Sequence, residues 1–222
     1  MTTAGARGRM RRAMGLGRLV ALGGPEDGIW LAERAAASVL VKATAKAVLG
    51  TAVTRLDVRL ADPGAAAEPA VPAPPSALPP GAHRLTAEVS VWSGEPLLAA
   101  TAALRSALAR AAADRLGLVV TEVDLRVTAL PDHPLVPAPD HAPTPVTPSD
   151  AAGEAAAATA GVACLTAELG GRAVHTAVDH VRVEVATADG FRALDVGRAV
   201  RASVSAALAD GRPVAVLISS VA

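Results

Sequence analysis

Large aromatic side chains are nearly absent from this sequence. Trp30, Trp92 and Phe191 are the only ones among 222 residues, and there is no tyrosine. Because 51% of the residues are hydrophobic, the chain still has enough apolar material for a core, which we expect to consist of alanine, valine and leucine. The scarcity of rings also argues against a protein that stacks nucleic-acid bases on aromatic side chains.

Cysteine is limited to a single residue, Cys164. One cysteine forms neither an internal disulfide nor a cysteine-rich zinc site, and this fits a protein of the reducing cytoplasm. Cys164 lies in an apolar strand pattern, so we expect a buried and inert thiol. We therefore predict a cytoplasmic location.

Net charge is also absent, since 21 basic residues balance 21 acidic ones, and the whole molecule has no field that would attract nucleic acid. The exception is a basic N-terminal arm at 1–27. Five of its arginines precede the first acidic residue and are candidate contacts to a membrane or a partner: Arg7, Arg9, Arg11, Arg12 and Arg18. Each is worth about 1 kcal/mol near an anionic membrane, so we expect membrane contact to be weak and indirect.

Long apolar runs are missing as well. No stretch reaches the roughly 18 to 20 apolar residues that a membrane span needs. Arg18 interrupts the short apolar run near the N-terminus, which argues against a signal peptide there.

Proline, in contrast, is abundant and clustered. Fourteen of the 17 prolines lie in two tracts, at 62–81 and 131–150. Because proline lacks an N–H donor and disfavours helix in the preceding residue, both tracts should be extended and poor in backbone pairing. The predicted organisation is an arm at 1–27, a first unit at 28–130 with an insertion at 62–81, a linker at 131–150 and a second unit at 151–222.

The two predicted units match each other at an offset of 96 residues. The phrase "AEVSVWSG" ending at Gly94 corresponds to "VEVATADG" ending at Gly190. Alternating apolar residues before each glycine indicate a strand, and a 3.6-residue period after it indicates a helix whose inward stripe includes Leu104 and Val200. Gly94 and Gly190 are predicted to be structural turn residues, since glycine lets a strand turn sharply into a helix.

Each copy is predicted to have the order α-β-β-α-β. In the first, "GIWLAERAAASVLVKATAKAVLG" favours a helix and "TRLDVRL" a strand. In the second, "SDAAGEAAAATAG" favours a shorter helix, and "VACLTAELGGRAVHT" either one bent strand or a hairpin. The predicted fold class is therefore α/β of the α+β type, with two tandem units, each a small sheet covered by alanine-rich helices.

These motifs resemble the alkaline-shock or general-stress family of bacterial envelope stress proteins. The resemblance covers about 28–130 and, more weakly, 151–222; the position of the family's tyrosine before the turn glycine holds Trp92 and Ala188 here. It implies a non-enzymatic cytoplasmic scaffold. Such a protein would associate with itself or with a protein partner, which can be membrane-anchored, and would support envelope stress tolerance.

Catalytic and metal-binding motifs are not found in the sequence. It has no G-x-G-x-x-G after a strand, no phosphate-binding G-x-x-x-x-G-K-[ST] and no G-x-S-x-G elbow, and Lys42 and Lys46 fit a solvated helix face. Three Asp–His pairs offer metal-ligand chemistry without a completing cluster: Asp132–His133, Asp140–His141 and Asp179–His180. We predict no enzyme activity, no catalytic residue, no cofactor and no metal.

Two alternatives stay open. The order α-β-β-α-β is also found in KH-like RNA-binding domains, but neither copy has the G-x-x-G loop that grips the phosphate backbone, so nucleic acid is the less favoured partner. A protein that binds a small ligand is the other alternative.

Overall fold

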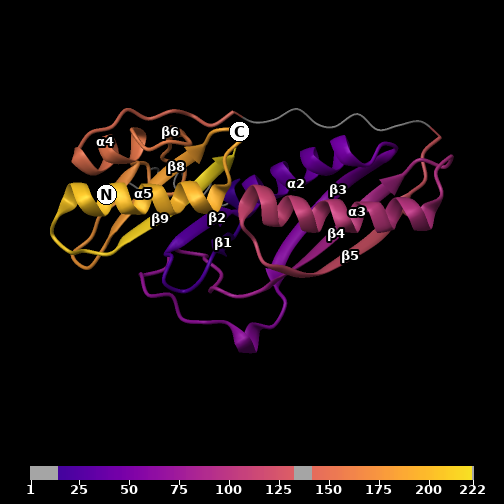
Figure 1. The fold of residues 1–222 in the computed structure, drawn as a ribbon, viewed down its shortest axis with the longest axis horizontal. Helices are drawn as coiled ribbons and strands as arrows, with labels where there is room; N and C mark the ends of the chain where they lie inside the picture. Colours follow the sequence, from indigo (N-terminus) through magenta and orange to yellow (C-terminus); the bar gives the residue numbers. More distant parts are fainter. Residues whose placement is uncertain (1–14, 133–141, 222) are drawn as a thin grey trace, which may run out of the picture. The chain divides into compact units, whose positions relative to one another are not determined.

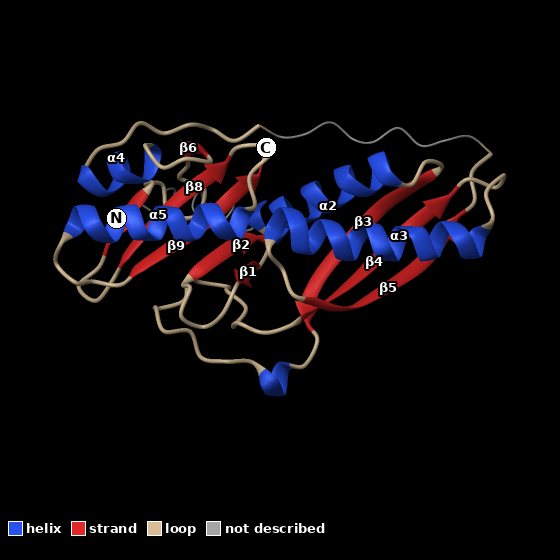
Figure 2. Cartoon of the chain, viewed as in Figure 1, coloured by secondary structure: helices blue, strands red, loops and turns tan. Residues whose placement is uncertain are grey.

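A computed structural model of the chain describes residues 15–132 and 142–221. Its helices and strands form a mixed α+β fold, which confirms the predicted fold class (Figure 2). The chain divides into two compact units. We call them the three-stranded unit, within Ala36–Ala66 and Gly81–His141, and the six-stranded unit, within Met1–Ala35, Ala67–Pro80 and Ala142–Ala222.

The three-stranded unit contains one sheet with helices on one of its faces (Figure 1). Strand β4 is central, antiparallel to β3 and parallel to β5. Helix α3 connects the two parallel strands and ends in a π-helical turn. The elements are α2 (Glu33–Ala47), of which the part from Ala36 on belongs to this unit, β3 (Thr51–Leu60), β4 (His83–Val91), α3 (Leu97–Ala111), the π-helical turn (Ala112–Leu116) and β5 (Val120–Ala129).

Alternate residues of β4 build the core of this unit. Leu85, Ala87 and Val89 are fully buried, and α3 buries Leu104 and Leu108 at 0% exposure. The alternation along the strand and the helical stripe are therefore confirmed.

The six-stranded unit repeats this plan and extends it. Strands β6 and β7 both run antiparallel to β8, and α5 leads from β8 to the parallel strand β9. The far edge of β9 pairs in parallel with β2, which pairs with β1. The elements are β1 (Leu19–Leu22), β2 (Ile29–Ala32), α4 (Ala151–Ala157), β6 (Val162–Leu165), β7 (Val174–Thr176), β8 (Val181–Thr187), α5 (Ala193–Leu208) and β9 (Val214–Val221).

The internal repeat is thus present in the topology, with one break in the offset. Leu85 pairs with Val123, 38 positions later, whereas its counterpart Val181 pairs with Val214, 33 positions later. The five-residue π-helical turn at the end of α3 has no counterpart after α5. The offset of 96 therefore holds through the helices and ends before the closing strands.

The structure corrects the predicted start of the first unit. Ile29–Ala32 forms strand β2 instead of the first turn of a helix, and α2 begins at Glu33. The bulky residues Ile29, Trp30 and Leu31 lie in register with β9 and are 0 to 1% exposed, because a central strand buries both of its faces. Part of the predicted arm is β1, so the expected boundary at residue 27 cuts through a β-hairpin.

The first proline tract is also better paired than predicted. Leu19 donates its N–H to the Ser76 carbonyl at 3.2 Å and accepts from the Leu78 N–H at 2.7 Å. Val71 is 2% exposed, and it lies so close to Gly28 that a Cβ there would be 2.8 Å from Val71 Cγ2. Residues 67–80 therefore belong to the six-stranded unit instead of forming an insertion in the other one.

The segment "VACLTAELGGRAVHT" follows the bent-strand alternative. β6 and β7 both run antiparallel to β8 and meet successive parts of it, so they do not pair with each other as a hairpin. In the second proline tract, Val146 bridges to Leu165, and residues 133–141 lie outside the described ones.

Candidate functional site

The predicted basic arm is only partly described. Four of its arginines lie outside the described residues: Arg7, Arg9, Arg11 and Arg12. Arg18 donates from Nη2 to Glu33 Oε1 at 2.7 Å and from Nε to Glu33 Oε2 at 3.2 Å. Arg18 therefore anchors the start of α2, and its role as a contact to a membrane or a partner stays a prediction.

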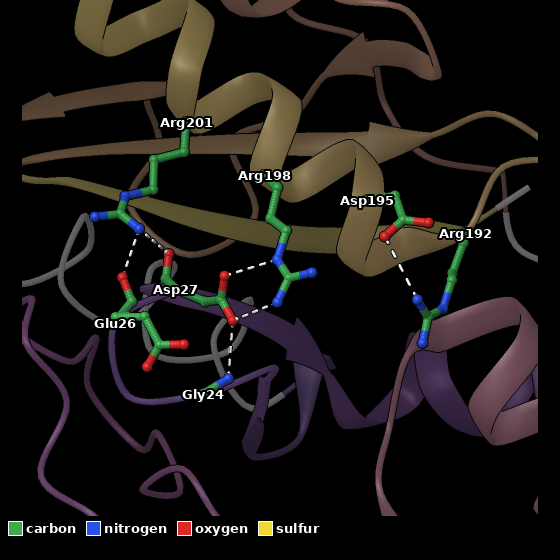
Figure 3. Close-up of polar contacts among 7 residues, drawn as sticks. All are labelled: Gly24, Glu26, Asp27, Arg192, Asp195, Arg198 and Arg201. Carbon is green, nitrogen blue, oxygen red and sulfur yellow. Dashed lines mark hydrogen bonds and ion pairs between the residues drawn. The ribbon is translucent and has the colours of Figure 1, made fainter.

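Two arginines of α5 hold the loop between β1 and β2, as Figure 3 shows. Arg198 donates from Nε to Asp27 Oδ1 at 2.8 Å and from Nη2 to Asp27 Oδ2 at 2.9 Å. The Gly24 N–H also donates to Asp27 Oδ2, at 2.8 Å. Arg201 donates to the main-chain carbonyls of Glu26 and Asp27. We call this group the arginine clamp.

Burial and charge make the clamp a stabilising contact. The Asp27 side chain is 8% exposed, against 50% for that of Arg198. The hydrogen bond from Arg198 lowers the pKa of Asp27 and outweighs the opposing effect of burial. Arg198 and Arg201 also line an open depression of about 320 Å³ with Ala202 and Ser205. Since their inner N–H groups already bind Asp27 and main-chain carbonyls, the clamp fixes the loop.

A second polar group surrounds a buried carboxylate, Glu184, in β8. Its Oε1 accepts from Thr166 Oγ1 at 2.9 Å and from the Glu168 N–H at 2.6 Å, while Oε2 accepts from the Leu169 N–H at 3.0 Å. Thr166 Oγ1 is also 2.6 Å from Ser219 Oγ. The loop after β6 therefore surrounds the Glu184 carboxylate of β8. Through Thr166, the same loop also contacts Ser219 of β9.

The environment of Glu184 opposes its ionisation. Glu184 is 2% exposed, and burial raises its pKa more than the three hydrogen bonds lower it. Its repeat counterpart Glu88 is half-buried. The sequence match between the two glutamates therefore conceals a difference in environment, because the loop between β6 and β7 surrounds Glu184, whereas the continuous strand β3 runs past Glu88.

His83, at the start of β4, is a buried imidazole. It is 1% exposed, and neither ring nitrogen has a hydrogen-bond partner. Burial lowers its pKa, with the nearby Val119 carbonyl opposing the shift. The neutral form of His83 is therefore favoured. This buried histidine was not singled out from the sequence, because histidines were considered there in Asp–His pairs.

The Asp–His pairs do not assemble into one site in the described part of the chain. His180 Nδ1 lies 2.8 Å from Asp179 Oδ1, and this contact lowers the pKa of Asp179. Asp132 instead meets Ser93, and three members lie outside the described residues: His133, Asp140 and His141. Over residues 15–132 and 142–221, no three His, Cys, Asp or Glu residues gather as metal ligands would.

Cys164 is half-buried and not fully buried as predicted, and partial burial raises the pKa of its thiol. A raised pKa disfavours the reactive thiolate.

Large apolar side chains are exposed at one end of the three-stranded unit. Three segments meet there, because the Trp92 N–H donates to the Gly50 carbonyl at 2.7 Å and the Ser93 N–H donates to the Pro131 carbonyl at 3.1 Å. Helix α3 begins next to them. We define the apolar end by its exposed large residues: Leu49, Trp92, Leu97, Leu98 and Leu130.

The repeat shows that these positions are not exposed by necessity. Leu98 is 86% exposed, whereas its counterpart Leu194 is 4% exposed and lies under the β1–β2 loop, where a Cβ on Gly23 would be 3.0 Å from Leu194 Cδ1. Ala193, the counterpart of Leu97, is 0% exposed. In one copy a segment of the same chain covers the start of the helix, and in the other the start of the helix carries two exposed leucines.

The two predicted turn glycines differ in the structure. Gly190 has a φ of +83°, in the left-handed region that favours glycine. Gly94 also lies in a turn but has no positive φ, so the conformational reason given for both applies to Gly190 alone.

Comparisons of the chain with protein-family models, with curated proteins and with solved structures found no match. Among the described residues, no helix is both long enough and apolar enough to cross a membrane.

Proposed function

We propose that this protein is a non-enzymatic interaction protein that binds another protein through the apolar end of its three-stranded unit. The supporting observation is that five large apolar side chains are exposed together there, in a chain with only three large aromatic residues. Exposed apolar groups that lie together mark sites of interaction with a protein, a membrane or a ligand.

The amino-acid types also favour a protein partner. Trp92 is 36% exposed and donates from Nε1 to the Asp132 carbonyl at 3.1 Å, so its indole is held in place while part of the ring stays accessible. A rigid, partly exposed tryptophan is typical of the residues that supply most of the binding energy in protein interfaces. Because Leu97 and Leu98 lie at the start of α3, a partner segment with an apolar face fits this surface.

The biological setting is proposed from the family resemblance. We place the protein in the cytoplasm, in an envelope stress response, with membrane contact only through its partner. Four of the five arginines that offered direct membrane contact lie outside the described residues, and Arg18 binds Glu33. Direct lipid binding should be weak, because each basic residue contributes only about 1 kcal/mol near an anionic membrane.

Site-specific photo-crosslinking in membrane-stressed cells tests the proposal. A photoreactive residue at position 98 should capture a partner, and the purified partner should bind the wild-type chain but not the double variant L97S/L98S. Val178 is a matched control, because it is 98% exposed and apolar but lies in the other unit. Binding that L97S/L98S leaves intact, or that V178S also removes, would contradict the proposed surface.

A further inference from the structure

Strand β5 forms an edge of the three-stranded sheet that is left open among the described residues. It pairs with β4 on one side only. Its repeat counterpart β9 pairs with β8 on one side and with β2 on the other. The same strand position has thus accepted an additional strand in one copy and is unoccupied in the other; Figure 1 shows β5 at the margin of its sheet.

The open edge is long, and its central part is regular between two register shifts. β5 has ten residues, and its pairing with β4 runs without a shift from Glu122 to Val127. Exposed edges are usually protected by charged side chains, lysine above all, or by a proline, a bulge or a very short strand, since their free N–H and C=O groups invite another strand. β5 contains no lysine and no proline, and this central stretch has no bulge. Its three charged residues, Glu122, Asp124 and Arg126, are of both signs, so they do not repel a strand with a matching charge pattern.

The two faces of β5 are sorted by polarity. Toward the helices, Val123, Leu125 and Val127 are only half-buried, although apolar residues next to them on β4 are fully buried. The opposite face carries exposed polar groups: Glu122, Asp124, Arg126 and Thr128. An added strand that covers the apolar half and matches the charges would complete the sheet.

A second β5 meets these conditions when it runs antiparallel with a two-fold axis at Leu125. In that register Val123 lies opposite Val127 of the second copy, and Asp124 lies opposite Arg126 of the second copy, twice by symmetry. A shift that places the axis at Asp124 would set two aspartates opposite each other, and an axis at Arg126 would set two arginines opposite each other. The register centred on Asp124 would also pair Glu122 with Arg126, but of these three registers only the one centred on Leu125 forms opposite-charge pairs without a like-charge pair.

Arg84 on β4 supports the same arrangement. Its Nε lies 3.8 Å from Asp124 Oδ2, and its guanidinium also pairs with Glu122. Asp124 would then lie between Arg84 of its own chain and Arg126 of the second copy, with each charge facing an opposite one.

We propose that β5 is a self-association surface on which a second copy of this chain adds its own β5, so that two three-stranded sheets join into one continuous sheet. The antiparallel arrangement pairs the β5 edges of both copies and closes this contact at a dimer, whereas head-to-tail addition of β5 to the β3 edge of a next copy would leave a new edge each time. This surface is separate from the apolar end proposed to bind a protein partner.

Charge reversal tests the proposal with the full-length chain. Analytical ultracentrifugation should find the wild type at twice the 22.1 kDa chain mass. Asp124→Arg and Arg126→Asp should each weaken the dimer roughly tenfold or more, because each places like charges opposite each other at two positions. An equimolar mixture of the two variants should restore the dimer, since positions 124 and 126 of one variant, both basic, then face positions 126 and 124 of the other, both acidic.

The mixture also controls for folding, because misfolded variants would not rescue each other. In a Cys164→Ser background, Leu125→Cys should form a disulfide-linked dimer, whereas Thr121→Cys should not, because two such residues would lie roughly 25 Å apart across the axis. A wild type that stays monomeric up to near-millimolar concentration, or a mixture without restored dimer, would overturn the proposal. L97S/L98S should dimerise normally, so the failure of one proposal leaves the other standing.

Discussion

Asp27 and Arg198 are 171 positions apart in the sequence and form a paired, two-bond contact in the six-stranded unit. The carboxylate comes from the β1–β2 loop and the guanidinium from the exposed side of α5. This contact holds the β1–β2 hairpin against helix α5 of the second copy.

Removing the charge of Asp27 should therefore lower the free energy of unfolding. We expect Asp27→Asn to cost about 1.5 to 3 kcal/mol, because Arg198 and the Gly24 N–H would lose a charged acceptor. Chemical denaturation at neutral pH measures this cost. Asp195→Asn is the control: Asp195 lies 3.5 Å from Arg192 and is 58% exposed, so its replacement should cost about 0.5 kcal/mol or less. Equal effects would show that the clamp adds no specific stability.

Glu184 should make stability fall as pH rises. Its pKa is raised in the folded chain, so the folded state holds its proton at pH values where the unfolded chain has released it. The stabilisation that Glu184 contributes is thus fully present below the pKa of a glutamate in the unfolded chain, about 4.3. It is lost as pH rises toward the pKa of Glu184 in the folded chain. Denaturation of the wild type and of Glu184→Gln from pH 4 to 7 should find the cost of the substitution largest at acid pH. A cost that does not change with pH would contradict the assignment.

Local patterns in the sequence predicted the core well. The alternation in β4 and the helical period identified Leu104 and Val200 as buried twins, and both are 0% exposed. Such periods depend only on the geometry of one strand or one helix, so a single sequence carries them. The fold class and the repeat followed from these same patterns.

Contacts between distant segments were missed. Ile29–Ala32 directly precedes a true helix, and nothing local shows that its partner is β9 at the far end of the chain. The short "IWLA" run between Gly28 and the helix was the available signal, since bulky β-branched and aromatic residues favour strands. Asp27 and Arg198 each look like ordinary surface charges in sequence, and only the packing of β2 brings them together.

The buried twins allow a matched pair of substitutions on α3. Leu104→Ala should cost about 2 to 5 kcal/mol, because it leaves a cavity at a fully buried site. Leu98→Ala, on the same helix and 86% exposed, should change stability by no more than about 0.5 kcal/mol. Thermal unfolding distinguishes the two, and a large loss at Leu98 would place that side chain in an interface of the purified protein.

The first proline tract should resist proteases in spite of its composition. Val71 anchors it, and we expect Val71→Asp to release 67–80 by burying an unpaired charge. Limited proteolysis should then cut the variant there while the wild type stays intact in this stretch. Ala73→Asp serves as the control, because Ala73 is exposed in the same tract. Rapid cleavage of the wild type within 67–80 would contradict the docked conformation.

The turn glycines offer a test of backbone conformation. Gly190→Ala should cost roughly 1 to 2 kcal/mol, because an L-residue with a Cβ is strained at a φ of +83°. Gly94→Ala should cost less, since its φ is not positive and its added Cβ would meet only Trp92 side-chain atoms at 3.4 to 3.5 Å, an ordinary contact. Chemical denaturation of both variants measures the difference. Equal losses of unfolding free energy in the two variants would contradict this prediction. The repeated glycine would then have the same role in both copies, as the sequence alone suggested, and the difference in φ would not affect stability.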